Sequence, residues 1–88
     1  MRTDTAAPIE VYWVIEAPDG QQMRCALHHT PAGLEVRLIE VEGNSIRRIK
    51  PVADAAVAGD LARTWMIEML EDSRNGYRVV QLGRLDPL

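Results

Sequence analysis

The feature that most constrains the fold is a single change in the spacing of apolar residues along the chain. From Ile9 to about Glu42, apolar and polar residues alternate with a period of two, which is typical of half-buried strands. From about Ala53 to Ser73 the spacing becomes that of an amphipathic helix. Strands that precede a helix, rather than alternating with helices, indicate an α+β fold with an antiparallel sheet.

Turn-forming residues divide the alternating region into strands that follow one another as a meander. Pro18-Asp19-Gly20 separates the first two strands, and the tetrapeptide of residues 30–33 (TPAG) separates the second from the third. Gly43-Asn44 then turns the chain into a fourth expected strand, residues 45–50 (SIRRIK), which Pro51 should end.

The alternation also predicts which side chains face the core. In the first strand one face carries Trp13 and Ile15, together with Ile9 and Val11, while Tyr12 and Val14 point the other way. In the third strand, residues 34–42, the alternation changes phase at Leu38-Ile39. This change predicts either a β-bulge or a strand that is covered on both faces.

The helix should begin after Asp54 as N-cap and stop at Asn75-Gly76. Its apolar half predicts that it packs on the apolar face of the sheet, where Trp13 and Trp65 are expected to meet. Residues 77–82 (YRVVQL) are β-prone and could complete this sheet or that of a neighbour. The predicted buried stripe is Val57, Ala58, Leu61, Ala62, Trp65, Met66 and Met69.

The predicted architecture is therefore α+β. It is an antiparallel meander of three or four strands, followed by one amphipathic helix packed on one sheet face and a short C-terminal strand (ββββαβ). Residues 9–85 should form a single domain after a disordered tail at residues 1–8.

The composition argues against two classes of partner. Ten Lys and Arg against thirteen Asp and Glu give a net charge of −3, so nucleic acid and anionic membranes are not attracted overall.

No stretch reaches the roughly 18 consecutive apolar residues of a transmembrane helix. The single cysteine allows no intramolecular disulfide, and residues 1–10 lack the apolar segment of a signal peptide. We therefore expect a small acidic cytoplasmic protein.

The one cysteine and both histidines lie within residues 24–33 (RCALHHTPAG), which raises the question of a metal or thiol site. On a strand, Cys25 and His28 point to opposite faces, and Cys25 and His29 are about 13 Å apart. Zinc ligation and thiol activation both need closer groups. We therefore expect no metal, no cofactor and no catalytic residue, with Cys25 in the core. A site formed by His28 or His29 across two subunits stays open.

Other charged groups suit a solvated surface better than a site. Arg47, Arg48 and Lys50 form a basic run that matches phosphate chemistry, but few aromatics are interleaved, and a charged edge strand is the favoured interpretation. The carboxylates of Glu40 and Glu42 lack positioned partners for acid–base work. No phosphate-binding glycine motif and no GxSxG elbow occurs. An anion or nucleic-acid binder that uses the basic run is the alternative function.

Apolar residues expected at the surface carry the main functional prediction. One helix cannot cover both faces of a sheet, and 88 residues make a thin core. Tyr12 and Val14 on the uncovered sheet face, with Ile67 and Leu70 on the helix, are therefore the predicted interface residues. We predict a non-enzymatic protein-interaction module, such as an adaptor, inhibitor or regulatory subunit, whose partner is a protein and which forms a homodimer.

Overall fold

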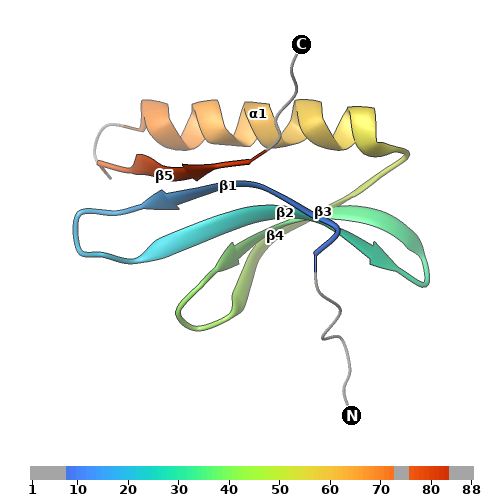
Figure 1. Ribbon diagram of the computed structural model, residues 1–88, viewed down its shortest axis with the longest axis horizontal. Coiled ribbons are helices and arrows are strands. Elements are labelled where there is room, and N and C mark those ends of the chain that lie inside the picture. Colours follow the sequence, from blue (N-terminus) through green and yellow to red (C-terminus); the bar gives the residue numbers. More distant parts are fainter. Residues whose placement is uncertain (1–7, 73–75, 84–88) are drawn as a thin grey trace.

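The computed structural model describes residues 8–72 and 76–83, which form one five-stranded sheet and one helix. All neighbouring strands are antiparallel, and the order across the sheet is β4-β3-β2-β1-β5. α1 lies across one face of this sheet (Figure 1). The predicted α+β fold is confirmed. In chain order the elements are β1 (Glu10–Glu16), β2 (Gln22–Thr30), β3 (Gly33–Glu40), β4 (Ser45–Val52), α1 (Ala55–Glu71) and β5 (Arg78–Leu82).

The core lies between α1 and the sheet face that α1 covers, which we call the helix face. Trp13 of β1 is fully buried there and shares one apolar cluster with Trp65 of α1, as predicted. The indole Nε1 of Trp13 donates a hydrogen bond of 2.8 Å to the carbonyl oxygen of Ala62, which satisfies a buried donor and ties α1 to the sheet. The other buried members are Tyr12, Ile15, Met23, Cys25, Leu27, Val36, Leu38, Ala58 and Ala62.

α1 begins as the sequence predicts. The Asp54 side chain accepts a hydrogen bond of 3.0 Å from the backbone N–H of Val57, which makes it the N-cap. The helix ends at Glu71, and the predicted stop at Asn75 lies outside the described residues. Val57 itself was predicted to be buried and is 46% exposed. That prediction is wrong because Val57 points about 100° away from the buried Ala58, beyond the edge of the apolar stripe.

A bulge in β1 changes which of its residues face the core. Val11 pairs with Ala26 and Trp13 pairs with Cys25, so Tyr12 is an extra residue between them. The alternation therefore changes phase, and Val11 lies on the face opposite α1 while Tyr12 is buried in the core at 2% exposure. The predictions that Val11 faces the core and that Tyr12 faces the uncovered side are both wrong.

The phase change at Leu38 and Ile39 has two origins. Leu38 pairs with Arg48 and Ile39 pairs with Ile46, so Arg47 is an extra residue and the bulge lies in β4. β3 pairs continuously with β2, and its Leu38 and Ile39 are both buried although they point to opposite faces. β3 is therefore buried on both faces at this point, and the bulge lies in the neighbouring β4 and not in β3, where it was predicted.

β4 runs to Val52, so the predicted strand end at Pro51 is wrong. Proline has no N–H to donate, but β4 is an edge strand, where one missing donor can face outward without breaking a ladder. The basic residues and the proline thus occupy the same outer strand.

β5 completes the chain's own sheet by pairing with β1. The Arg78 guanidinium donates to a Glu16 carboxylate oxygen at 2.7 Å, and the Gly83 backbone N–H donates to the Tyr12 carbonyl at 2.8 Å. The predicted tail, apart from Pro8, and residues 84–85 of the predicted domain lie outside the described residues. Within the described ranges no helix combines the length and apolar character needed to cross a membrane.

Candidate functional site

The cysteine and histidines of β2 are separated as strand geometry predicts. Cys25 is fully buried on the helix face, His28 lies buried on the opposite face, and His29 is exposed. Burial raises the pKa of the Cys25 thiol from its usual 9.0 to about 12, which keeps it protonated and a poor nucleophile. Among the residues that the structure describes, no three His, Cys, Asp or Glu side chains are grouped as metal ligands.

The basic run of β4 is divided among different partners. Nη1 of Arg47 lies 3.2 Å from a Glu40 carboxylate oxygen, and Nη1 of Arg48 lies 3.2 Å from a carboxylate oxygen of Glu68 in α1. The Arg48 guanidinium also lies over the Trp65 ring, 5.3 Å from its centroid. Two of the three cations are thus already paired with carboxylates of the same chain.

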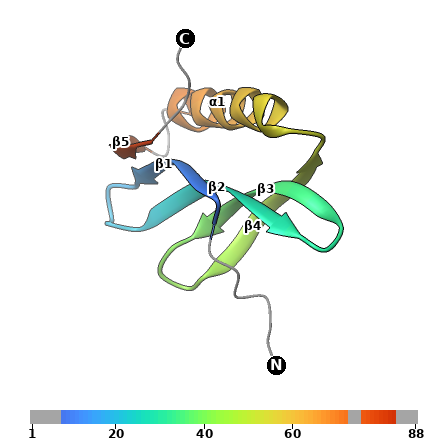
Figure 2. The same ribbon diagram turned by 45° about the vertical axis from the view of Figure 1, so that its right-hand side comes forward.

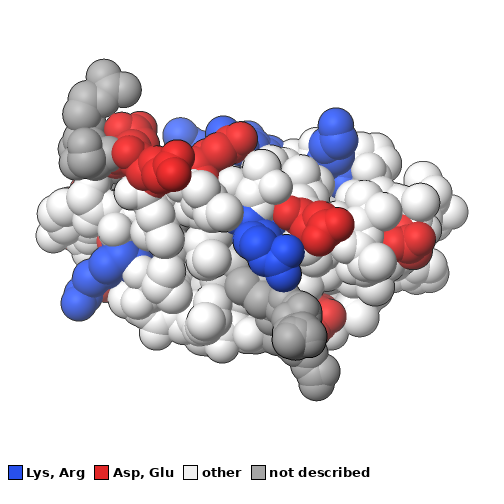
Figure 3. Space-filling model, turned by 90° about the horizontal axis from the view of Figure 1, so that it is seen from above, with Lys and Arg blue, Asp and Glu red and all other residues white. Residues whose placement is uncertain are grey.

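These cations also do not point to one place. Arg48 and Lys50 lie opposite Leu38 and Val36, on the helix face, whereas Arg47 is the extra residue of the bulge. Seen from the α1 side, positive and negative side chains are interspersed rather than collected into a single basic patch (Figure 3). The arrangement favours the interpretation of the basic run as a charged edge strand.

The sheet face opposite α1, which we call the open face, is covered by no described helix or strand (Figure 2). It carries several exposed apolar side chains. Ile46 and Ile49 of β4 are 49% and 48% exposed, and Val41 and Val80 are exposed to a similar degree. Open-face residues towards the middle of the sheet, Val14, Ala26 and Ile39, are buried.

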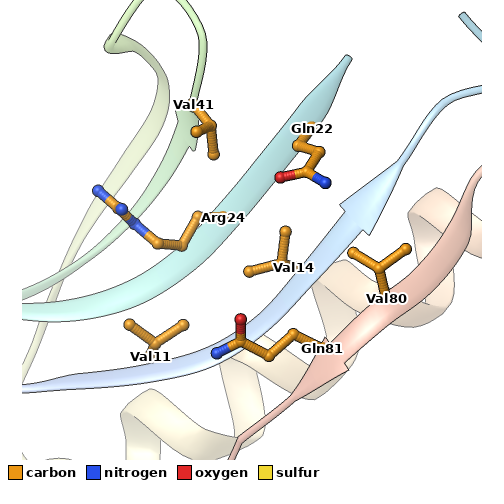
Figure 4. A pocket seen from close by; sticks show the side chains of 7 residues that line it. All are labelled: Val11, Val14, Gln22, Arg24, Val41, Val80 and Gln81. Carbon is orange, nitrogen blue, oxygen red and sulfur yellow. The ribbon is translucent and has the colours of Figure 1, made fainter. Parts of the chain in front are cut away.

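A depression of about 460 Å³ lies on the open face over β1, β2 and β5. Figure 4 shows Val14 at its centre, with Val80 and Gln81 of β5 on one side and Arg24 on the other. Its apolar walls are valines, and its polar groups are two amides and one guanidinium. The remaining lining residues are Val11, Gln22 and Val41.

Arg24 is the one charged side chain that lines this depression. Its cross-strand neighbours, Val14 on β1 and Ile39 on β3, are apolar. Its Nε is buried and has no hydrogen-bond partner, and Arg24 forms no ion pair with any residue that the structure describes. By contrast, Arg37 on the same face is paired with Glu35 at 2.6 Å. Arg24 therefore has no counterion on the open face among residues 8–72 and 76–83.

A second uncovered surface lies at the β5 edge of the sheet. Val79 and Leu82 lie opposite Ile15 and Trp13 of β1, so their side chains share the helix face, yet they are 37% and 61% exposed. The strand is held to β1 partly by Glu16, and the hydrogen bonds that Arg78 and Gln22 donate hold the pKa of this carboxyl below its usual range.

One flank of α1 extends this apolar surface. The ion pair between Arg48 of β4 and Glu68 shows that the flank of α1 carrying Glu68 faces the β4 edge. At 100° per residue, Leu70 lies about 160° around the helix axis from Glu68 and therefore faces the β5 edge, whereas Ile67 lies about 180° from the buried Ala58 and points away from the sheet. Both are exposed. Leu70, Val79 and Leu82 together are called the β5 flank below.

The four predicted interface residues thus have four different environments. Tyr12 is buried in the core and offers no surface, and Val14 forms the floor of the depression on the open face. Leu70 belongs to the β5 flank, and Ile67 lies exposed on the outer side of α1. Sequence reasoning missed Val79 and Leu82, although the absence of Lys and Pro from residues 77–82 was a usable signal. It also missed Arg24, because a missing counterion is visible only in three dimensions.

Comparison of the chain with protein-family models, with curated proteins and with solved structures finds no match in any of the three. Function is therefore argued below from the geometry of the chain itself.

Proposed function

We propose that this protein is a non-enzymatic protein-interaction module that forms a homodimer through its β5 flank. The observation that carries the proposal is the difference between the two edges of the sheet. Edge strands expose unpaired N–H and C=O groups, which favour pairing with another chain unless something blocks it. β4 is blocked in several ways, whereas β5 has much less to block it.

The β4 edge combines three devices that discourage strand pairing. It carries Arg47, Arg48 and Lys50, it contains Pro51, and its bulge at residue 47 distorts the backbone. β5 (RVVQL) contains neither Lys nor Pro, and its single cation, Arg78, is neutralised by Glu16. β5 is short and has an irregular register with β1, so the apolar flank above it must supply much of the contact.

A twofold axis perpendicular to the sheet would place β5 antiparallel to β5 of the second copy. Both copies of α1 would then lie on the same side of a continuous sheet, because such a rotation preserves the two faces. Leu70 of one copy would face its equivalent across the axis. The same apolar patch thus serves both copies, which is the requirement for an isologous interface.

The environments of Cys25 and of the β4 cations support a binding role over catalysis. The Cys25 thiol is buried and protonated, and the β4 cations are paired or divergent. A cytoplasmic location stays a prediction that rests on the single unpaired cysteine.

The experiment that tests the dimer is the solution mass by light scattering after size exclusion, measured over a wide range of protein concentration. Leu70→Lys and Leu82→Lys each place a charge in the β5 flank and should shift the mass towards that of a monomer. Val57→Lys and Ile49→Lys are matched controls, because these residues are similarly exposed but lie towards the β4 edge or on β4 itself.

A wild-type protein that is monomeric at every concentration would refute the proposal. So would a dimer that Val57→Lys or Ile49→Lys disrupts as strongly as the two flank variants do. In the second case the β4 side of the molecule would be the interface.

A further inference from the structure

Arg24 and the valines around it form a combination that the proposed dimer does not use. The depression lies on the open face, whereas the β5 flank lies on the helix face and along the edge. An exposed sheet face with a central cation disfavours a second copy stacked on it, because two equivalent Arg24 guanidinium groups would approach each other. The occupant should therefore carry a negative charge.

The walls of the depression limit what kind of anion fits. Val11, Val14, Val41 and Val80 offer hydrocarbon surface, and Gln22 and Gln81 offer amides that can donate or accept hydrogen bonds. Arg24 is the one cation of the lining, and a guanidinium matches a planar carboxylate in a two-pronged arrangement. A phosphate dianion would need more donors than one guanidinium and would gain nothing from the valines.

The carboxylates near this depression do not neutralise Arg24. Glu16 accepts hydrogen bonds from Gln22 at 3.4 Å and from Arg78 at 2.7 Å. Glu42 lines a smaller neighbouring depression of about 190 Å³ beyond Val41. Arg24 as a whole is only partly buried and lines the depression, so a carboxylate there would give its guanidinium the counterion that the described residues do not supply.

We propose that the depression on the open face binds a small amphipathic carboxylic acid, with its carboxylate at the Arg24 guanidinium and its hydrocarbon chain over Val14 and the valines beside it. A pocket of about 460 Å³ has room for such a molecule, since sites for small ligands commonly measure roughly 300–1,000 Å³. The site belongs to one chain and does not require the dimer.

The test is an NMR titration of the full chain, labelled with ¹⁵N, with sodium octanoate below its micellar concentration. Octanol and acetate are the control ligands, because octanol lacks the negative charge and acetate lacks the long hydrocarbon chain. Octanoate should shift the amide signals of Val14, Gln22, Val41 and Gln81. Octanol and acetate should bind at least about tenfold more weakly, the usual effect of losing a charge-assisted hydrogen bond or several buried methylenes.

Two arginine variants locate the charge that matters. Arg24→Gln should weaken octanoate binding about tenfold or more, whereas Arg47→Gln, which removes the same charge from β4, should leave it unchanged. Equal binding of octanol and octanoate would overturn the proposal, as would shifts that map elsewhere or an equal loss in both variants.

The wild-type ligand comparison keeps the proposal testable if Arg24→Gln does not fold. Binding of a short peptide with a C-terminal valine carboxylate, without binding of octanoate, would also overturn it and would point to a protein C-terminus as the occupant. A monomeric wild-type protein that binds octanoate would refute the proposed dimer while supporting this site.

Discussion

The same substitution, glycine to alanine, should have opposite effects at two positions of this protein. Gly59 lies inside α1, and a Cβ atom built on it meets nothing within 4 Å. Glycine in a helix interior is less favourable than alanine by about 0.5–1 kcal/mol, mainly because of the backbone freedom that it loses on folding. Gly59→Ala should therefore raise the free energy of unfolding by roughly that amount.

Gly83 follows β5 and lies against the backbone of β1. A Cβ built there would collide with the Val11 carbonyl oxygen and would lie 3.1 Å from the Val11 carbonyl carbon and 3.3 Å from the Tyr12 oxygen. These atoms are main chain and cannot rotate away, so Gly83→Ala should push the end of β5 from β1 and weaken the hydrogen bond of 2.8 Å from Gly83 to Tyr12. Overpacking of this kind destabilises by about 1–3 kcal/mol.

Urea and thermal denaturation followed by far-ultraviolet circular dichroism measure both effects. In a domain of this size about 1 kcal/mol corresponds to a change in Tm of roughly 4–8 °C, so the two variants should differ clearly in opposite directions from wild type. The urea midpoint should move without a change in slope for Gly59→Ala. A loss of stability in Gly59→Ala, or no loss in Gly83→Ala, would refute this reasoning.

Three further outcomes are expected. Trp13→Phe should lower the free energy of unfolding by about 1–3 kcal/mol, because it leaves the Ala62 carbonyl without its indole donor and reduces the core volume; urea denaturation checks this. Burial raises the pKa of Cys25 from 9.0 and that of Tyr12 from 10.0, each to about 12. The folded state thus holds these two protons more tightly than the unfolded state does. The free energy of unfolding should therefore keep its full value below pH 9 and should fall as the pH rises towards 12. A free energy of unfolding that stays constant over that range would contradict the burial of these two groups. The Cys25 thiol should react with a disulfide reagent only as fast as the chain unfolds, which absorbance measurements in increasing urea will show.

The sequence predicted the order of the elements because each depends on local information. Alternation, turn residues and the Asp54 cap each act within a few positions, and every predicted element is present in the structure. The errors in β1 arose where one extra residue, Tyr12, reversed the facing of its neighbours. Period-two alternation cannot reveal such a bulge when residues on both sides of it are apolar, as Val11 and Val14 are.

The candidate sites were predictable only in part for a different reason. Ile67 and Leu70 could be recognised as surface residues because helical periodicity alone places them. The exposure of Val79 and Leu82 depended on the pairing of β5 with β1, which joins segments more than sixty positions apart in the chain. The unpaired state of Arg24 depends on what every other strand brings near it, and no local pattern encodes that.

The pairing of β1 with β5 has a consequence for how the chain can be reconnected. The strands that come first and last in the sequence are neighbours, and the end of β5 lies beside the middle of β1, where Trp13 pairs with Leu82. A short linker between them, with new ends opened in the exposed turn at Gly43-Asn44, would give a circular permutant that keeps every strand pair. In that chain the β1–β5 pair would become a local hairpin, while β3 and β4 would lie at opposite ends of the chain and become the most distant pair. Because the β3–β4 ladder is longer than the β1–β5 ladder, the permutant should fold more slowly than the natural order of the same strands.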